Sequence, residues 1–69
     1  MFYRFIVDYI SCDRQFTIDK GTIVVLIKVI KYKEQPSIAI VRCPLLDDKE
    51  LCLPLLDLMF CSREYKGEQ

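Results

Sequence analysis

The chain contains no histidine and no tryptophan, and only two of its 69 residues are glycine. Without histidine, the commonest general base near neutral pH is missing, and the serines have no imidazole to activate them as nucleophiles. We therefore expect a protein that is not an enzyme and that has no cofactor. No apolar run approaches the roughly 18 residues that a membrane-spanning helix requires, so we expect no contact with a membrane.

Charge of one sign is not in excess either, since ten basic and ten acidic residues give a formal net charge of zero. No overall field therefore draws the chain toward nucleic acid. The first residues, M-F-Y-R-F-I-V-D, lack a basic region followed by an apolar one. We therefore expect no signal peptide and a cytoplasmic location.

The four cysteines, Cys12, Cys43, Cys52 and Cys61, are spread along the chain. In a reducing cytosol thiols stay free, and small free cysteines behave as apolar residues, so we expect them to be reduced and largely buried. Disulfide bonds are the weaker alternative. Structural zinc sites usually contain pairs of ligands about two to four residues apart. No two cysteines are that close here, so we expect no metal site.

Hydrophobic residues make up 52% of the sequence. A chain this short forms one domain and buries only about 60% of its unfolded surface, so part of the apolar surplus must lie on the outside. We expect this domain to cover residues 1–61. The last residues, 62–69 (S-R-E-Y-K-G-E-Q), are polar and are expected to form a frayed tail.

The most apolar stretch runs through I-V-V-L-I-K-V-I and predicts a long strand over Thr22–Lys33, because β-branched residues favour a pleated surface. Side chains alternate between the two faces of a strand. One face carries Ile23, Val25 and Ile27, and the other carries Val24, Leu26 and Lys28. Since both faces are apolar, the pattern alone does not decide which one is buried. The turn Asp19-Lys20-Gly21 precedes the strand, and Gly21 is expected at positive φ.

Further short strands are predicted on both sides of this stretch, over residues 2–10, 16–18, 38–43, 50–53 and 59–61, with a single helical turn over 55–58. In the first of them, the odd positions Tyr3, Phe5, Val7 and Tyr9 form the face expected to be buried. Short strands at close spacing, separated by turn signals, indicate a small all-β barrel or sandwich.

Three motifs in order resemble the Src-homology-3 (SH3) family. Phe5-Ile6-Val7-Asp8-Tyr9 resembles its Ala-Leu-Tyr-Asp-Tyr strand, and Phe16–Thr22 is similar to its Leu-Ser-Phe-Lys-Lys-Gly-Asp stretch. Leu53–Leu58 resembles its Ile-Pro-Ser-Asn-Tyr-Val segment. The resemblance implies a five-stranded SH3-like barrel with one helical turn before the last strand. It also implies that Val24 and Leu26 point inward. Lys28 shares their face in a regular strand but favours water, and a strong bend near Leu26–Lys28 would reconcile the two.

The family binds proline-rich peptides in a groove lined by aromatic side chains. Here Val7 replaces the first groove tyrosine, Asp57 stands where the last would be, and tryptophan is absent. Only Tyr9 and Pro54 of the groove are kept. The resemblance therefore implies the scaffold without useful binding of proline-rich peptides.

These observations favour a non-enzymatic protein–protein interaction module, or a small regulatory subunit, that acts by surface contact and can form a homo-oligomer. The residues expected to bind the partner protein are Ile23, Val25, Ile27, Tyr9 and Pro54. The alternative is a small-barrel nucleic-acid-binding protein, since basic residues beside an aromatic ring can contact a single strand. That site would use Lys28, Lys31, Tyr32, Lys33 and Arg42. A thiol or metal site is a third and weaker hypothesis.

Overall fold

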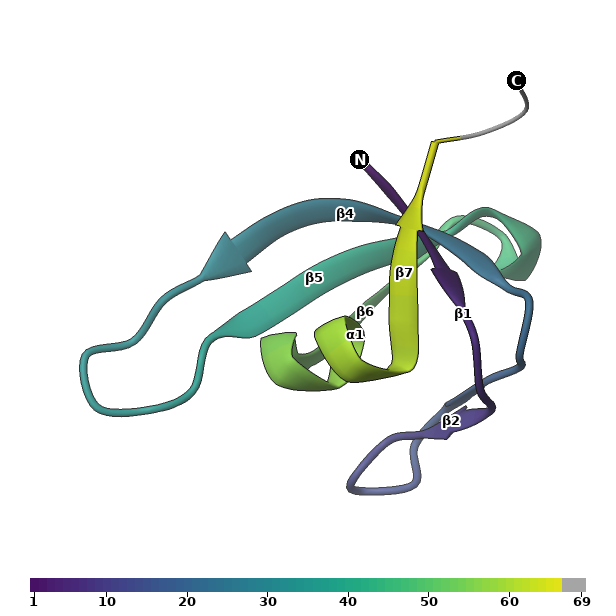
Figure 1. Cartoon of the computed structure of the whole chain (residues 1–69). Coiled ribbons are helices and arrows are strands. Elements are labelled where there is room, and N and C mark those ends of the chain that lie inside the picture. Colours follow the sequence, from purple (N-terminus) through teal and green to yellow (C-terminus); the bar gives the residue numbers. More distant parts are fainter. Residues whose placement is uncertain (67–69) are drawn as a thin grey trace.

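The computed structural model describes residues 1–66, which form seven short strands and two short helices (Figure 1). The strands are β1 (Phe2–Phe5), β2 (Tyr9–Ile10), β3 (Thr17–Ile18), β4 (Ile23–Ile30), β5 (Ile38–Cys43), β6 (Lys49–Pro54) and β7 (Ser62–Tyr65). The helices are the 3-10 turn η1 (Pro44–Leu46) and α1 (Leu55–Cys61). The expectation of a mainly β protein is therefore confirmed.

Five of the strands form one antiparallel sheet in the order β6-β5-β4-β1-β7, and β2 pairs with β3 in a separate hairpin. The predicted strand over residues 38–43 is found with the same bounds as β5. The sheet curves strongly, with β4 arching over the molecule, but it does not close into a barrel (Figure 1). Strands β6 and β7 are its two edges.

The bend in β4 is a β-bulge. Its pairing with β5 shifts register between Leu26 and Lys28, so Ile27 is an extra residue. Residues two apart normally share a face, and the extra residue removes this constraint. Leu26 therefore packs against the core while Lys28 is exposed, and Val24 is fully buried. The inward direction of Val24 and Leu26 is confirmed, although β4 ends at Ile30 rather than near Lys33.

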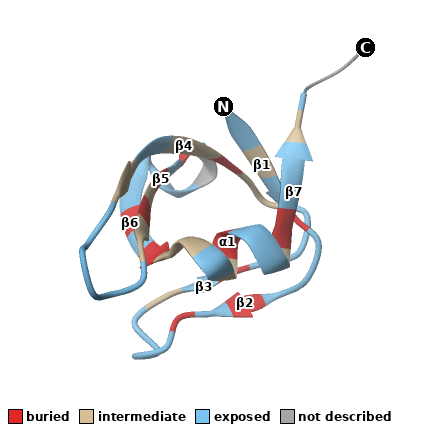
Figure 2. Ribbon diagram, turned by 60° about the vertical axis from the view of Figure 1, so that its left-hand side comes forward, coloured by how far each residue is buried: buried red, intermediate tan, exposed pale blue. Residues whose placement is uncertain are grey.

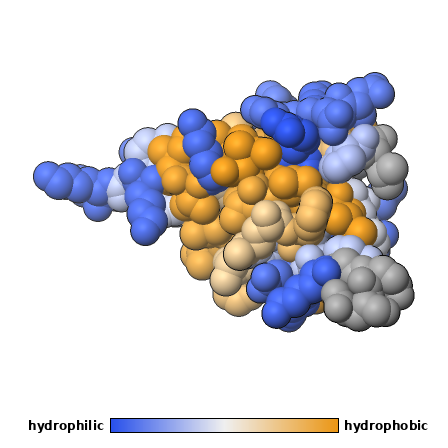
Figure 3. Space-filling view, turned by 90° about the horizontal axis from the view of Figure 1, so that it is seen from above, coloured by the Kyte–Doolittle hydropathy of each residue, from blue (hydrophilic) through white to orange (hydrophobic). Residues whose placement is uncertain are grey.

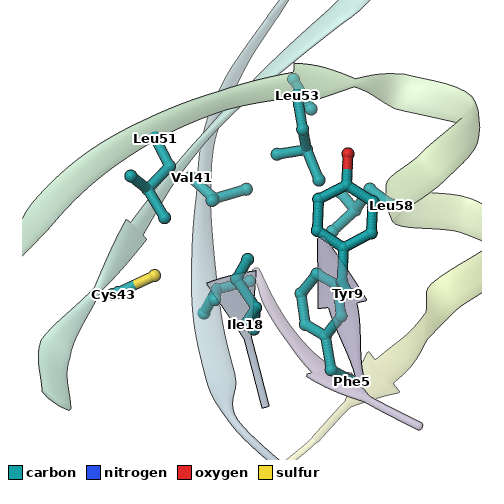
Figure 4. Close-up of a cluster of buried hydrophobic side chains, with 10 residues drawn as sticks. Phe5, Tyr9, Ile18, Val41, Cys43, Leu51, Leu53 and Leu58 are labelled. Atoms are coloured by element: carbon teal, nitrogen blue, oxygen red, sulfur yellow. The ribbon is translucent and has the colours of Figure 1, made fainter. Parts of the chain in front are cut away.

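The core lies between the concave side of the sheet, α1 and the β2–β3 hairpin (Figure 2). Its buried apolar side chains are Phe5, Tyr9, Ile18, Val24, Ala39, Val41, Cys43, Leu51, Leu53 and Leu58. Figure 4 shows members of this set converging from all three elements on the same space. The hairpin and the helix thus act as covers for the inner side of the sheet.

The prediction of one strand over residues 2–10 is wrong, because β1 ends at Phe5 and β2 begins at Tyr9. Between them, the carbonyl of Phe5 accepts a hydrogen bond from the N–H of Gly21, and the Asp8 carboxylate accepts one from the N–H of Lys20. These bonds hold the chain in a bend that interrupts the alternation of faces. Val7, predicted to be buried, is consequently 45% exposed.

The prediction for the C-terminal part is also corrected. Residues 59–61 belong to α1 rather than to a strand, and the final strand is β7, which pairs with β1 along its whole length. The polar segment 62–65 is therefore part of the sheet and not of a frayed tail. The expected fraying of residues 67–69 lies outside the described residues. The helical turn before the last strand is confirmed, and it is longer than predicted.

Gly21 has φ of 93° at the turn into β4, as predicted. Its N–H bonds to the carbonyl of Phe5, and the N–H of Thr22 bonds to the carbonyl of Asp19. Side chains rarely adopt this φ, so glycine is required here for conformational reasons.

Candidate functional site

An apolar area covers the outer side of the sheet, opposite the core (Figure 3). Directly paired residues of an antiparallel ladder share a face, and so do residues two apart in one regular strand. The pairings of Phe2 with Val25, Arg4 with Ile23, Lys28 with Ile40 and Ile30 with Ile38 place these residues on the outer side. We define the outer sheet face by its apolar members, which are Phe2, Ile23, Val25, Ile30, Ile38 and Ile40.

These side chains remain partly accessible to solvent. Phe2 is 47% exposed, and the other members are half-buried by their neighbours on the same face. Ile27 sits in the bulge of β4 and is 38% exposed. The outer sheet face therefore offers a band of aliphatic surface that runs across β1, β4 and β5.

The edge of the outer sheet face is charged. Arg42 pairs with Glu50 of β6, with Nη2 and Oε2 separated by 3.4 Å. Both side chains are largely exposed, so this ion pair contributes little to stability. Lys28, exposed on the central strand β4 and paired with Ile40, places a further cation within the face. Apolar surface bordered by charged groups such as Arg42 and Glu50 is typical of protein-interaction sites.

Two further predicted partner-binding residues, Tyr9 and Pro54, lie away from the centre of this face: Tyr9 is on the β2–β3 hairpin, and Pro54 pairs with Ile38 at the β6 edge of the sheet. They line a groove of about 620 Å³ between the β2–β3 hairpin and β6. Its walls also include Phe16, Cys12 and Cys52. The structure thus brings Ile23 and Val25 together on the outer sheet face and leaves Ile27 exposed beside them. It places Tyr9 in the groove, and Pro54 both in the groove and at the β6 edge of the outer sheet face.

Tyr9 is held firmly in its position. Its hydroxyl donates to Asp57 Oδ2 at 2.6 Å, and its ring lies 5.9 Å from that of Phe5 and 6.1 Å from that of Phe16. Burial, together with the hydrogen bond to Asp57, raises the pKa of Tyr9 well above its usual value. The residue that the resemblance assigns to a peptide groove therefore works mainly as a link between hairpin and helix.

The loop of the hairpin forms one wall of the groove and is fixed by Ser11. Its Oγ donates to Asp13 Oδ1 at 2.8 Å and accepts the N–H groups of Gln15 and Phe16. The hydrogen bond from Ser11, with a second from the backbone of Gln15, lowers the pKa of Asp13. This wall of the groove is consequently held in place by local hydrogen bonds within the hairpin loop.

The cysteines differ from the expectation of general burial. Cys43 is buried and Cys61 is half-buried, whereas Cys12 and Cys52 are exposed, and all four are free thiols. Cys52 points away from the core because its neighbours Leu51 and Leu53 occupy the inner side of β6. Burial raises the pKa of the Cys43 and Cys61 thiols, and Asp57 adds to the effect at Cys61. Within residues 1–66, no group of three or more potential ligands is placed to hold a metal ion.

The residues of the nucleic-acid alternative form two groups. Lys28 and Arg42 lie on the outer side of neighbouring strands, where Arg42 is paired with Glu50. Lys31, Tyr32 and Lys33 follow the end of β4 and are exposed in the connection to β5. The structure therefore does not gather these five side chains into one compact patch.

The sequence reasoning missed Phe2, Ile30, Ile38 and Ile40 as parts of the outer sheet face. The strand register places each of them on the same face as Val25 or Lys28. The sequence offered one signal, the alternation of Phe2, Arg4 and Ile6 on one face. Interpreting it requires knowing which strands are neighbours in the sheet.

Comparisons with protein-family models, with curated proteins and with solved structures find no match to this chain. In the described part of the chain, no helix has the length and apolar character needed to cross a membrane.

Proposed function

We propose that this protein is a non-enzymatic protein-interaction module that binds through its outer sheet face. The observation that carries the proposal is the aliphatic band across β1, β4 and β5 on the side of the sheet away from the core. Burying an aliphatic side chain contributes about 1.5–3 kcal/mol relative to full exposure. Since these side chains are already half-buried, several of them together are needed to stabilise a complex.

We further propose that the scaffold is SH3-like. The support is the order of elements along the chain, with a hairpin after the first strand, a long bent strand, two more strands and a helical turn before the last strand. The inward direction of Val24 agrees with what the resemblance implies. A fold of this kind hosts many functions, so the function is argued from the surface.

The partner that we propose for the outer sheet face is a second copy of the chain. The formal net charge is zero, so two copies do not repel each other. Arg42 and Glu50 lie side by side at the rim, so a two-fold axis can place Arg42 of one copy near Glu50 of the other. A standard interface of about 800 Å² per partner is roughly 15% of the 5253 Å² surface.

Sedimentation equilibrium of the full chain tests this proposal. The wild type is expected to be a dimer at micromolar concentration, and Val25→Lys is expected to be a folded monomer. Ile10→Lys is the matched control, because Ile10 is 62% exposed on the hairpin and lies outside this face. A wild type that stays monomeric up to about a hundred micromolar would refute self-association, because interfaces of this size typically bind more tightly.

Nucleic-acid binding is the second candidate. It is supported by Lys28 and Arg42 on one side of the sheet, with Lys31 and Lys33 just beyond the end of β4. Binding through phosphates weakens steeply as salt concentration rises. A gel shift with a single-stranded oligonucleotide, repeated at several salt concentrations, separates this candidate from the first.

A further inference from the structure

A second hollow, of about 310 Å³, lies beside β1 and β7, away from the groove that contains Tyr9. Three cationic side chains, Arg4, Lys20 and Arg63, line it together with one carboxylate, Glu64. Ile6 and Tyr65 supply apolar wall. Positive charge therefore predominates in a small concave site, although the whole chain has no net charge.

Arg4 and Arg63 stand directly opposite each other in the β1–β7 ladder. Side chains at such positions share a face and have β-carbons about 4.5–5.5 Å apart, and like charges there are destabilising. The ion pair found within residues 1–66 is Arg42–Glu50, and it involves neither of these arginines. These two arginines are thus neighbours on one face of the sheet, and among the described residues neither is in ion-pair contact with a carboxylate.

Arg63 is also fixed in place. Its Nη1 donates to the carbonyl of Ser62 at 2.9 Å and to that of Met59, at the end of α1, at 3.3 Å. Lys20 is positioned by the turn before β4, where its N–H donates to the Asp8 carboxylate at 2.8 Å. A cationic group that is already ordered, such as the guanidinium of Arg63, loses less conformational freedom when it binds a ligand.

We propose that this pocket binds the dianionic phosphate group of a phosphate monoester. A phosphate placed between Arg4 and Arg63 converts their repulsion into two charge-assisted contacts, and the planar guanidinium fork matches the spacing of phosphate oxygens. Lys20, in the turn before β4, adds a third positive charge to the lining of the pocket. The three cations against one carboxylate favour a dianion over a monoanion. Ile6 and Tyr65 are placed to contact the organic part of the ester.

Titration of the full-length protein with phenyl phosphate, followed by two-dimensional amide NMR at constant ionic strength, tests the proposal. We expect saturable shifts at residues 4–6, 20–21 and 63–65. Inorganic phosphate is expected to bind at the same residues but more weakly, since it lacks the ring that reaches the apolar wall. Shifts that do not saturate, or that are spread over the chain, would overturn the assignment.

Substitutions locate the site. Arg4→Gln and Lys20→Gln are each expected to weaken phenyl phosphate binding by roughly tenfold, the effect of losing one charge-assisted hydrogen bond. Arg14→Gln, in the hairpin loop, is the matched control and should bind as the wild type does. The amide spectrum shows whether each variant is folded. A folded Arg4→Gln that binds with unchanged affinity would refute the proposal.

Benzoate separates a phosphate site from a general anion site, because it presents the same ring with a single negative charge. We expect its affinity to be at least about fivefold lower than that of phenyl phosphate, because a dianion interacts more strongly with three cations. Equal affinities for the two probes would contradict the assignment to phosphate.

Discussion

The hydroxyl of Tyr9 donates a hydrogen bond of 2.6 Å to Asp57 Oδ2, joining two residues that are 48 positions apart in the sequence. The contact ties the β2–β3 hairpin to α1, the two elements that cover the inner side of the sheet. The SH3 resemblance gives Tyr9 to a ligand groove and leaves Asp57 in place of a groove tyrosine. In this chain the two side chains bind each other instead.

Removing this bond should lower stability and change its pH dependence. Tyr9→Phe is expected to reduce the free energy of unfolding by about 0.5–2 kcal/mol, because Asp57 is only half-buried and can be hydrated. The pKa of Tyr9 is raised in the folded state above its ordinary value of 10.0. The resulting stabilisation is complete below pH 10 and is lost as the pH rises beyond it, because the unfolded tyrosine then ionises first.

Urea unfolding between pH 7 and pH 11 measures both effects. The wild type should lose stability above pH 10 more steeply than Tyr9→Phe. Tyr32→Phe is the matched control, because Tyr32 is 49% exposed in the connection between β4 and β5. Parallel pH profiles for the wild type and Tyr9→Phe would show that the hydroxyl of Tyr9 does not couple to folding.

The sequence was sufficient to predict an element wherever the residues of that element alone determine its structure. The β-branched run Ile38–Val41, ended by Pro44, predicts β5 with its observed bounds, and Gly21 predicts the positive φ before β4. The pattern did not reveal which face of β4 points to the core, because Val24 and Val25 are equally apolar. The register with β5 and the extra residue Ile27 decide it.

Elements fixed by distant partners could not be predicted. The break after Phe5 depends on hydrogen bonds from Gly21 and Lys20, which local alternation does not reveal. The strand Ser62–Tyr65 has a polar sequence and exists because its backbone pairs with the open edge of β1. The basic pocket escaped notice for the same reason, since Arg4 and Arg63 meet only through that pairing.

Gly21→Val should destabilise the fold by about 1–3 kcal/mol, through backbone strain alone. The position has φ of 93°, and a β-carbon added there meets no atom within 4 Å, so no steric clash contributes. Gly21→Asn should cost less, because asparagine tolerates positive φ better than a β-branched residue. Urea unfolding of both variants gives the comparison. Equal losses for valine and asparagine would show that backbone conformation is not the cause.

The four thiols should react with an aromatic disulfide reagent in a fixed order. Cys12 and Cys52 are exposed and should react rapidly in the native protein, whereas Cys43 is buried and should react only on unfolding. Cys61, half-buried and with a raised pKa, should fall between them. In denaturant without reductant, all four should be titrated. Fewer than four free thiols, in protein kept from air, would indicate disulfide bonds.

Proline-rich peptides should not bind usefully in the groove between the hairpin and β6. The groove has no tryptophan, Val7 is exposed in place of a tyrosine, and the hydroxyl of Tyr9 already bonds to Asp57. Calorimetry with a panel of such peptides is expected to show no binding in the micromolar range. Micromolar affinity for any of them, abolished by Tyr9→Ala, would mean that the groove has kept its ligand after all.

Lysine at two adjacent positions of β4 should have opposite consequences. Val24 is fully buried, so Val24→Lys places a charge in the core and should cost on the order of 3–5 kcal/mol, enough to unfold a domain of this size. Val25 is on the outer sheet face, where lysine can extend its amine into water, so Val25→Lys should change stability by less than about 1 kcal/mol. Circular dichroism during urea unfolding measures both. If Val25→Lys unfolded and Val24→Lys did not, the inner and outer faces of β4 would have to be exchanged, and the proposed interaction surface would be part of the core.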